Sequence, residues 1–217
     1  MAEHTLITTE PNAEAQALNK LRVAPAAHLA QAMADAQVDG ERSVALRETP
    51  FAVQLGVRAV LGTASAEAIE GILGFELPTE HGQTTGNPDG VHALWIGPDE
   101  FLIVDPSRQQ VQGEATTLQV ALDGLPGQVL DLSANRTLLT LTGNSARAVL
   151  EKGCPADLHP RVFAVGTAIA TELGPVPVLL HRSGEQEYRI YPRASFADFV
   201  VRWILDASVE FASPEVP

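Results

Sequence analysis

The sequence predicts an α+β fold made of two fused β-α-β-β-α units. Short apolar runs between turn residues indicate strands, and apolar residues spaced three and four apart indicate amphipathic helices. The elements of the first half recur in the same order in the second half, at an offset of about 85 residues, which is too long for a solenoid repeat. A duplicated unit explains this agreement, although a chance coincidence of common elements would look the same.

The first unit is predicted over residues 46–126. Residues 51–57 alternate between large apolar and small or polar side chains, as a half-buried strand does. Apolar residues at helical spacing follow, and Gly74 is the expected end of that helix. The remaining elements are a loop rich in Pro, Gly, Asn and Asp over 78–90, strands over 93–96 and 101–104 joined by a Gly-Pro-Asp-Glu turn, and a helix over 117–123.

The second unit is predicted over residues 127–217. A strand over 137–141 leads through Gly143-Asn144-Ser145 into a helix that ends at Gly153. The last helix is the clearest in the chain, because its apolar residues follow one helical face from Phe196 to Ala207. Between these helices the sequence predicts a loop over 154–161 and strands over 167–173, 176–180 and 187–191. We expect residues 46–217 to form one compact domain.

Residues 1–45 differ from the rest because they are rich in Ala and Gln, with few large apolar side chains. Pro25 is suited to the first turn of a helix that would place Leu29 and Met33 on one side. The segment is therefore predicted to be a partly helical N-terminal arm that lies on another surface, or else a partly ordered tail.

The composition excludes several classes of protein. The chain has 217 residues, of which 14 are Lys or Arg and 27 are Asp or Glu, so its net charge is −13. This charge argues against nucleic acid or an anionic membrane as the main partner, and favours a basic protein surface. Cys154 is the single cysteine, which excludes a disulfide within the chain. No secretory signal or long apolar segment is present, so we expect a cytoplasmic protein.

The common catalytic and nucleotide-binding motifs are absent from the sequence. There is no Gly-rich dinucleotide fingerprint, no Walker-type loop and no His-Glu-x-x-His zinc motif. At the Gly143 turn, Asn144 or Ser145 is expected to cap the helix, and an anion site near Arg147 is the alternative. We therefore predict no catalytic, cofactor-binding or metal-binding residue in this chain.

Histidines and tryptophans give no sign of a site either. His92 and His181 are separated from other candidate metal ligands in the sequence, so they are expected to be solvated or to cap backbone groups. Trp95 and Trp203 lie on apolar periodicities and are expected to pack in the core.

The most unusual stretch runs from Cys154 to Arg161 and brings a thiol, a carboxylate, an imidazole and a guanidinium into one short loop. A zinc site, a Cys–His nucleophile pair and a rigid loop after a helix are the three interpretations. The rigid loop needs no fourth ligand and no third catalytic residue. In it we single out a candidate subunit interface made of Cys154, Asp157, His159, Pro160 and Arg161.

Four segments together resemble the gamma-subunit family of heterotetrameric sarcosine oxidase. The most specific is Gly153-Cys154-Pro155-Ala156-Asp157-Leu158-His159-Pro160, in its place after a helix. The others are residues 43–51, residues 94–102 with their Gly-Pro-Asp-Glu turn, and residues 193–199 at the start of the last helix. The resemblance extends from about Pro25 to Ala207, which is most of the chain.

The resemblance implies a fold like that of the glycine-cleavage aminomethyltransferase, a folate-binding fold. It also implies a non-catalytic, structural role beside alpha, beta and delta subunits. The complex demethylates sarcosine oxidatively to glycine, with hydrogen peroxide and formaldehyde or 5,10-methylenetetrahydrofolate as the other products. Its FAD, FMN, NAD, tetrahydrofolate and zinc are implied on the other subunits, with no cofactor bound by this chain. The alternatives are the equivalent subunit of a related N-methyl amino acid oxidase or dehydrogenase, and a stand-alone, folate-binding aminomethyltransferase-like protein.

Overall fold

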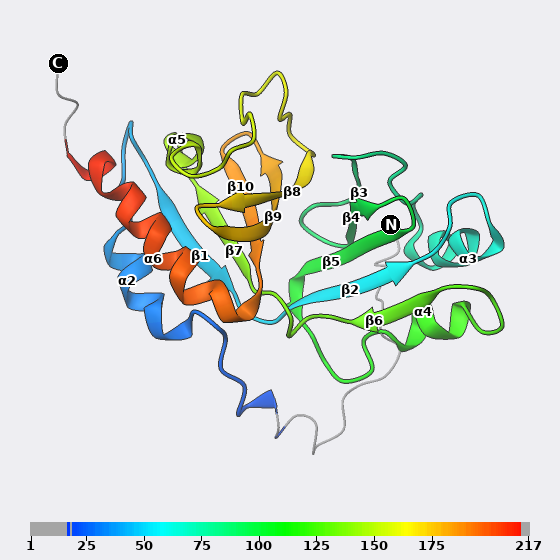
Figure 1. The fold of residues 1–217 in the computed structure, drawn as a ribbon. Helices are drawn as coiled ribbons and strands as arrows, with labels where there is room; N and C mark the ends of the chain where they lie inside the picture. The colour runs from blue at the N-terminus through cyan, green and yellow to red at the C-terminus, as the bar shows by residue number, and fades with distance from the viewer. Residues whose placement is uncertain (1–16, 18, 214–217) are drawn as a thin grey trace. The chain divides into compact units, whose positions relative to one another are not determined.

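The computed structural model describes residues 17 and 19–213, which divide into two units (Figure 1). Unit 1 comprises the described part of Met1–Val23 together with Phe51–Ala134. Unit 2 comprises Ala24–Pro50 and the described part of Asn135–Pro217. The described part of the chain therefore begins in unit 1, contributes residues 24–50 to unit 2, returns to unit 1 and continues from residue 135 in unit 2.

Unit 1 is a five-stranded antiparallel sheet, in the order β3-β4-β5-β2-β6, on which the helices α3 and α4 pack. Its core gathers the inward side chains of β2 and β5 with Ile69 and Leu73 of α3 and Leu118 of α4. Gly74 ends α3 in the left-handed conformation, as predicted, with a φ of 75°. The elements are β2 (Ala52–Arg58), α3 (Ala64–Leu73), β3 (Thr84–Gly86), β4 (His92–Gly97), β5 (Glu100–Gln109), α4 (Thr116–Ala121) and β6 (Gln128–Asp131).

A buried ion cluster stabilises the end of β5 in unit 1. The Arg108 guanidinium lies 2.9 Å from the Asp105 carboxylate and also binds the carboxylate of Glu114. The Glu114 side chain is fully buried, so its charge is tolerated only because Arg108 is paired with it. The cluster connects β5 to the loop that leads into α4.

Unit 2 is also a five-stranded antiparallel sheet, in the order β1-β7-β10-β9-β8. Its strands are β1 (Ala45–Thr49), β7 (Leu138–Thr142), β8 (Ala168–Leu173), β9 (Val176–Gly184) and β10 (Glu187–Pro192). Its helices are η1 (Ala27–Leu29), α2 (Ala30–Asp35), α5 (Ala146–Glu151), η2 (Ala194–Phe196), α6 (Ala197–Ser208) and η3 (Val209–Ala212).

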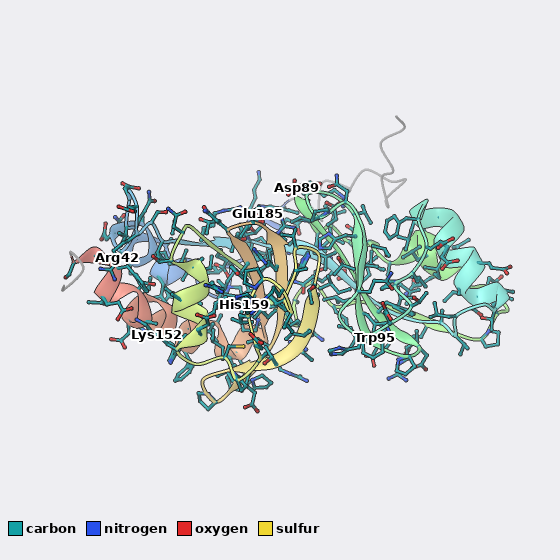
Figure 2. The ribbon with its side chains drawn as sticks, turned by 90° about the horizontal axis from the view of Figure 1, so that it is seen from above. Arg42, Asp89, Trp95, Lys152, His159 and Glu185 are labelled. Carbon is teal, nitrogen blue, oxygen red and sulfur yellow. The ribbon has the colours of Figure 1, made fainter. Side chains whose placement is uncertain are left out.

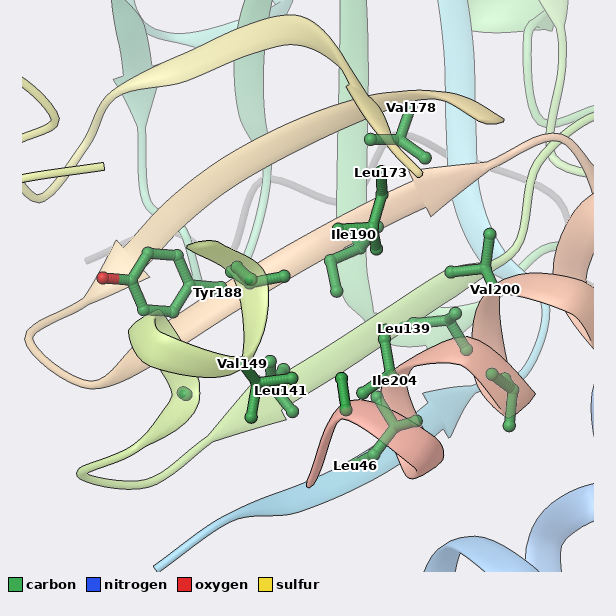
Figure 3. Packing of buried hydrophobic residues seen from close by; sticks show 14 of the residues in the cluster. Leu46, Leu139, Leu141, Val149, Leu173, Val178, Tyr188, Ile190, Val200 and Ile204 are labelled. Atoms are coloured by element: carbon green, nitrogen blue, oxygen red, sulfur yellow. The ribbon is translucent and has the colours of Figure 1, made fainter. Parts of the chain in front are cut away.

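The core of unit 2 forms where α6 packs on the sheet (Figure 3). Val200 and Ile204 of α6 are fully buried, as are Leu139 of β7 and Ile190 of β10. Tyr188, near the start of β10, is buried in the same cluster. The helical face predicted from the 3.6-residue period is buried only in part: Val200, Ile204 and Ala207 are buried, but Phe196 and Phe199 are 38% and 45% exposed. The face that α6 buries also includes Ala197 and Val201, which the prediction left out.

The two sheets have the same strand order, which supports the predicted duplication. Aligning β2 with β7 places β3, β4 and β5 opposite β8, β9 and β10, and β6 then corresponds to β1. The fifth strands are exchanged along the sequence: β6 precedes β7 yet pairs with β2, and β1 precedes β2 yet pairs with β7. The predicted boundaries 1–45, 46–126 and 127–217 miss this exchange, since pairing assigns β1 to unit 2 and β6 to unit 1.

Part of the N-terminal arm is a helical element of unit 2. Leu29 and Met33 are buried in that core, and the backbone N–H of Ala26 donates to both carboxylate oxygens of Glu48, at 3.1 and 3.2 Å. His28 Nε2 lies 2.6 Å from Asp198 Oδ1 on α6. Residues 24–35 thus form a packed arm, whereas residues 1–16 and 18 lie outside the described residues.

Two expectations about aromatic rings had different outcomes. Trp95 and Trp203 are half-buried and pack against the cores of units 1 and 2, as predicted. His92 and His181 are not solvated, because each residue is only 1% exposed on a strand, whereas the contact of His92 Nδ1 with the Gly90 carbonyl, at 3.0 Å, agrees with the alternative of capping a backbone group. No helix in the described part of the chain is long and apolar enough to cross a bilayer.

Candidate subunit-interface loop

The loop after α5 is attached to the core of unit 2 by three buried side chains. Cys154 is 9% exposed, and Leu158 and Phe163 are 1% and 2% exposed, all within the core cluster. The backbone N–H of Cys154 continues the helical pattern by donating to Leu150, at 2.9 Å. The segment between the anchors Leu158 and Phe163 is short, so its backbone is held at both ends.

The segment from His159 to Val162 forms a tight polar turn between these anchors. The His159 N–H donates to Asp157 Oδ1 at 2.9 Å, and the Arg161 N–H donates to His159 Nδ1 at 3.2 Å. The N–H groups of Val162 and Phe163 both donate to the His159 carbonyl at 2.8 Å. The turn is therefore ordered by its own hydrogen bonds, although its side chains are exposed.

A buried arginine attaches the far end of the loop to the sheet. Arg182 of β9 is 5% exposed, and its guanidinium donates to the carbonyls of Phe163 and Glu185, both at 2.9 Å. The Phe163 ring stacks on Tyr188, with 6.4 Å between centroids and 4° between planes. Burial raises the pKa of the Tyr188 hydroxyl, although the Arg182 charge opposes this effect.

The structure separates the predicted interface residues into two groups. Asp157, His159 and Arg161 come together in the turn, and with Pro160 they are exposed; His159 is labelled in Figure 2. Cys154 lies apart from them in the core, so its thiol does not belong to the exposed surface.

The geometry favours the rigid-loop interpretation over the other two. The Cys154 thiol contacts Thr171 Oγ1 at 3.6 Å, and the ring nitrogen Nδ1 of His159 accepts from Arg161. This arrangement does not provide a thiol–imidazole nucleophile pair. Within the described part of the chain, no three His, Cys, Asp or Glu side chains are grouped as metal ligands.

The turn at the start of α5 also differs from the prediction. Ser145 occupies the N-cap position, yet neither it nor Asn144 caps the helix through its side chain. Instead the N–H groups of Asn144 and Ser145 donate to the hydroxyl and the carbonyl of Ser43, at 3.1 Å in each case. Because these donors are already used and α5 has only six residues, the anion site near Arg147 finds no support.

Two exposed valines were missed as members of the candidate interface. Val162 is 65% exposed and Val165 is 48% exposed, on either side of the anchor Phe163. Sequence reasoning concentrated on chemically reactive side chains and treated the valines as ordinary loop residues. The signal that could have identified them is the spacing of three apolar residues in a polar loop that cannot bury all of them.

Comparison with solved structures first identifies the class of fold. The glycine cleavage system aminomethyltransferase T from Bartonella henselae matches with a TM-score of 0.54 at 17% identity, over 82% of this chain and 48% of that one. At this identity the match concerns the fold alone, and it agrees with the predicted aminomethyltransferase-type fold.

Closer comparisons identify the family. The model of the sarcosine oxidase gamma subunit family matches residues 59–210. The sarcosine oxidase gamma subunit of Corynebacterium sp. strain U-96 is 52% identical over 91% of this chain and 95% of that protein, and that of Arthrobacter sp. is 49% identical over the full length of both. A chain of heterotetrameric sarcosine oxidase from Corynebacterium sp. U-96, in complex with pyrrole 2-carboxylate, superposes with a TM-score of 0.86 over 91% of this chain and 100% of that one. The chain belongs to the sarcosine oxidase gamma subunit family.

Proposed function

We propose that this chain is a non-catalytic, structural subunit of a heterotetrameric sarcosine oxidase, assembled with alpha, beta and delta subunits. The observation that carries the proposal is the match over 91% of this chain, at a TM-score of 0.86, to a whole chain of the heterotetrameric enzyme. A chain with the same backbone fold over 91% of its length can occupy the same place in such a complex.

In this proposal the oxidation of sarcosine to glycine takes place on the other subunits, which carry FAD, FMN, NAD, zinc and tetrahydrofolate. The sequence of this chain lacks the Gly-rich fingerprint that cradles a dinucleotide, which is consistent with such a division. The contribution of the chain is then to the stability and geometry of the complex.

We assign one contact of this assembly to the exposed turn Asp157–Val165 of unit 2. Its backbone is already ordered by the anchors Leu158 and Phe163, so docking does not pay the entropy of ordering a loop. Val162 and Val165 offer apolar area, and Arg161 offers a positive charge beside it. An apolar centre with a charged rim is the usual anatomy of a specific interface. The facing surface is therefore expected to hold an apolar patch next to a carboxylate.

The test is co-purification of the four subunits after co-expression. Arg161→Glu and Val162→Asp are each expected to reduce the amount of this chain recovered with tagged alpha subunit by about tenfold, which corresponds to about 1.4 kcal/mol. Arg193→Glu is the matched control, since Arg193 is an exposed base of the same unit outside the turn. Circular dichroism of the free variants should match the wild-type chain, because all three side chains are exposed.

Two results would contradict the proposal at different levels. If the wild-type chain were not retained by the other subunits, the assignment to a heterotetramer would be wrong. If both turn variants assembled as fully as Arg193→Glu, the heterotetramer would stand and the turn would not be a contact.

A further inference from the structure

A groove runs between α2 and β1 in unit 2 and has a volume of about 420 Å³. It is mostly apolar, and every residue that lines it belongs to the segment 24–50. The lining consists of Ala24, Ala27, Ala30, Met33, Ala34, Gln37, Leu46, Arg47, Glu48 and Pro50.

One wall of the groove is the outer edge of a sheet. Among the residues that the structure describes, β1 is the terminal strand in the order β1-β7-β10-β9-β8 and pairs with β7 alone. The backbone N–H and C=O groups on the other side of an edge strand form a template for one more strand. α2 flanks this strand at the groove, leaving a channel between helix and strand.

The other wall is a helical face of small side chains. The Leu29 and Met33 side chains are buried in the core. Ala27, Ala30 and Ala34 are exposed and line the groove. A solvated helix face is normally occupied by charged residues. Alanines at this spacing instead allow another backbone to approach closely.

The charges of the groove favour an acidic occupant. Glu48 already accepts from the Ala26 N–H, and it also accepts from the Thr137 hydroxyl. Arg47 is exposed, and the one hydrogen bond of its guanidinium within the described part of the chain is a long one, 3.4 Å, to the Thr49 hydroxyl. Glu48 is therefore used within the chain, and the positive charge of Arg47 is the one that a ligand in the groove would meet. This is so although the net charge of the chain is −13.

We propose that an extended segment of another subunit of the complex adds to β1 as a further antiparallel or parallel strand. Its aliphatic side chains would enter the alanine-lined groove, and an acidic residue would meet Arg47. Peptides bind in this way to other domains that present a strand edge beside a helix, where main-chain hydrogen bonds give affinity and side-chain pockets give specificity. This inference rests on the proposed assembly, but it uses a surface separate from the turn Asp157–Val165.

The proposal is tested with the full chain, free and in the co-expressed complex. Ala34→Glu places a bulky carboxylate in the groove, and Arg47→Glu reverses its charge. Each is expected to weaken retention in the complex by about tenfold. Gln31→Glu is the matched control, because it adds the same charge on an exposed position of the same helix outside the groove lining.

Amide hydrogen exchange reports directly on the strand edge. Those amides of β1 (residues 45–49) that do not bond to β7 are expected to exchange at least about tenfold more slowly in the complex than in the free chain, as added strand hydrogen bonds require. Equal exchange in both states, together with full assembly of Ala34→Glu and Arg47→Glu, would overturn the proposal while leaving the heterotetramer intact.

Three further outcomes would also overturn it. Protection in the free chain that disappears on deletion of residues 1–16 would make the occupant a segment of this chain. Protection that rises with the concentration of the free chain would make it a second copy. A wild-type chain that does not assemble at all would remove the proposed function and this inference together.

Discussion

Replacement of Gly153 by alanine is expected to destabilise unit 2, because Trp203 packs directly on this glycine. A Cβ atom at position 153 would lie 2.4 Å from Cζ2 and 2.8 Å from Cη2 of the Trp203 indole. It would also lie 3.1 Å from the backbone nitrogen of Gly174, whose N–H donates to the Gly153 carbonyl at 2.9 Å. The new methyl group therefore has ring atoms on one side and backbone on the other.

The magnitude follows from these distances. Non-bonded carbon atoms rest about 3.5–4.0 Å apart, so the indole must withdraw by about 1 Å or more. Overpacking of this kind costs about 1–3 kcal/mol. Alanine also reduces the conformational entropy of the unfolded chain relative to glycine, which offsets about 0.4–1 kcal/mol of this destabilisation. We expect Gly153→Ala to lower the free energy of unfolding of unit 2 by about 1–2 kcal/mol.

Each unit contains one tryptophan, which makes the assay specific. Urea unfolding of Gly153→Ala is followed by the fluorescence of Trp203 in a Trp95→Phe background, with circular dichroism as a second probe. Gly71→Ala is the control, since Gly71 is an exposed position within α3 where a Cβ meets nothing within 4 Å. That substitution is expected to raise the stability of unit 1 by about 0.5–1 kcal/mol, read from Trp95 in a Trp203→Phe background.

The result that would refute this reasoning is a Gly153→Ala protein as stable as its parent. A double-mutant cycle with Trp203→Leu identifies the cause. If the indole is responsible, Gly153→Ala should lower the free energy of unfolding less than half as much in the Trp203→Leu background as in the parent. An unchanged cost would assign the effect to Gly174 instead.

Three other substitutions test separate features. Hydrogen bonds from Arg202, and to a smaller extent from His28, hold the pKa of Asp198 below its usual value of 3.8. The ionised Asp198 side chain therefore stabilises the folded protein at neutral pH, and this contribution is lost as the pH falls through the lowered pKa. The melting temperature of the wild type should exceed that of Asp198→Asn at pH 7, and the difference should vanish in strong acid. Gly143 has a φ of 116°, and a Cβ atom at this position would lie 2.2 Å from the Ser43 carbonyl oxygen. Gly143→Ala should therefore lower the free energy of unfolding in urea by at least about 3 kcal/mol. A decrease below about 1 kcal/mol would contradict the turn geometry. Glu114→Ala removes the buried one of the two carboxylates that pair with Arg108 and leaves only Asp105, so it should cost about 1–3 kcal/mol by thermal unfolding. A neutral effect would show that Glu114 does not stabilise β5.

Most of the regular elements could be predicted from the sequence because their apolar residues are periodic. Val53, Leu55 and Val57 identify β2, although Gln54 on the opposite face is buried as well, and the last predicted helix corresponds to α6, whose buried face runs to Ala207 without Phe199. The strands that were missed, β1, β3 and β6, have three to five residues each and lie at sheet edges or beside them. A strand this short has too few residues to show a period, and its identity depends on a partner that is distant in the sequence.

The candidate site was predicted in composition but not in layout. Residues 154–161 do form a rigid loop, yet Cys154 and His159 point to different environments, one buried and one exposed. Periodicity could not decide this, because a loop has none. The packing of the folded chain decides which side chains of this loop are buried: Cys154, Leu158 and Phe163 enter the core, and Val162 and Val165 stay exposed.

The exchanged fifth strands have a consequence for how the protein is synthesised. β1 leaves the ribosome before any of unit 1 after residue 50, but its partner β7 follows about 90 residues later, a closure that costs about 4 kcal/mol of chain entropy. Residues 51–134 can collapse locally in the meantime, so unit 1 is expected to fold during translation and unit 2 after it. Until β7 is made, the segment 24–50 is a nascent chain with unsatisfied strand edges, and the first-made part of unit 2 is the part most exposed to chaperones.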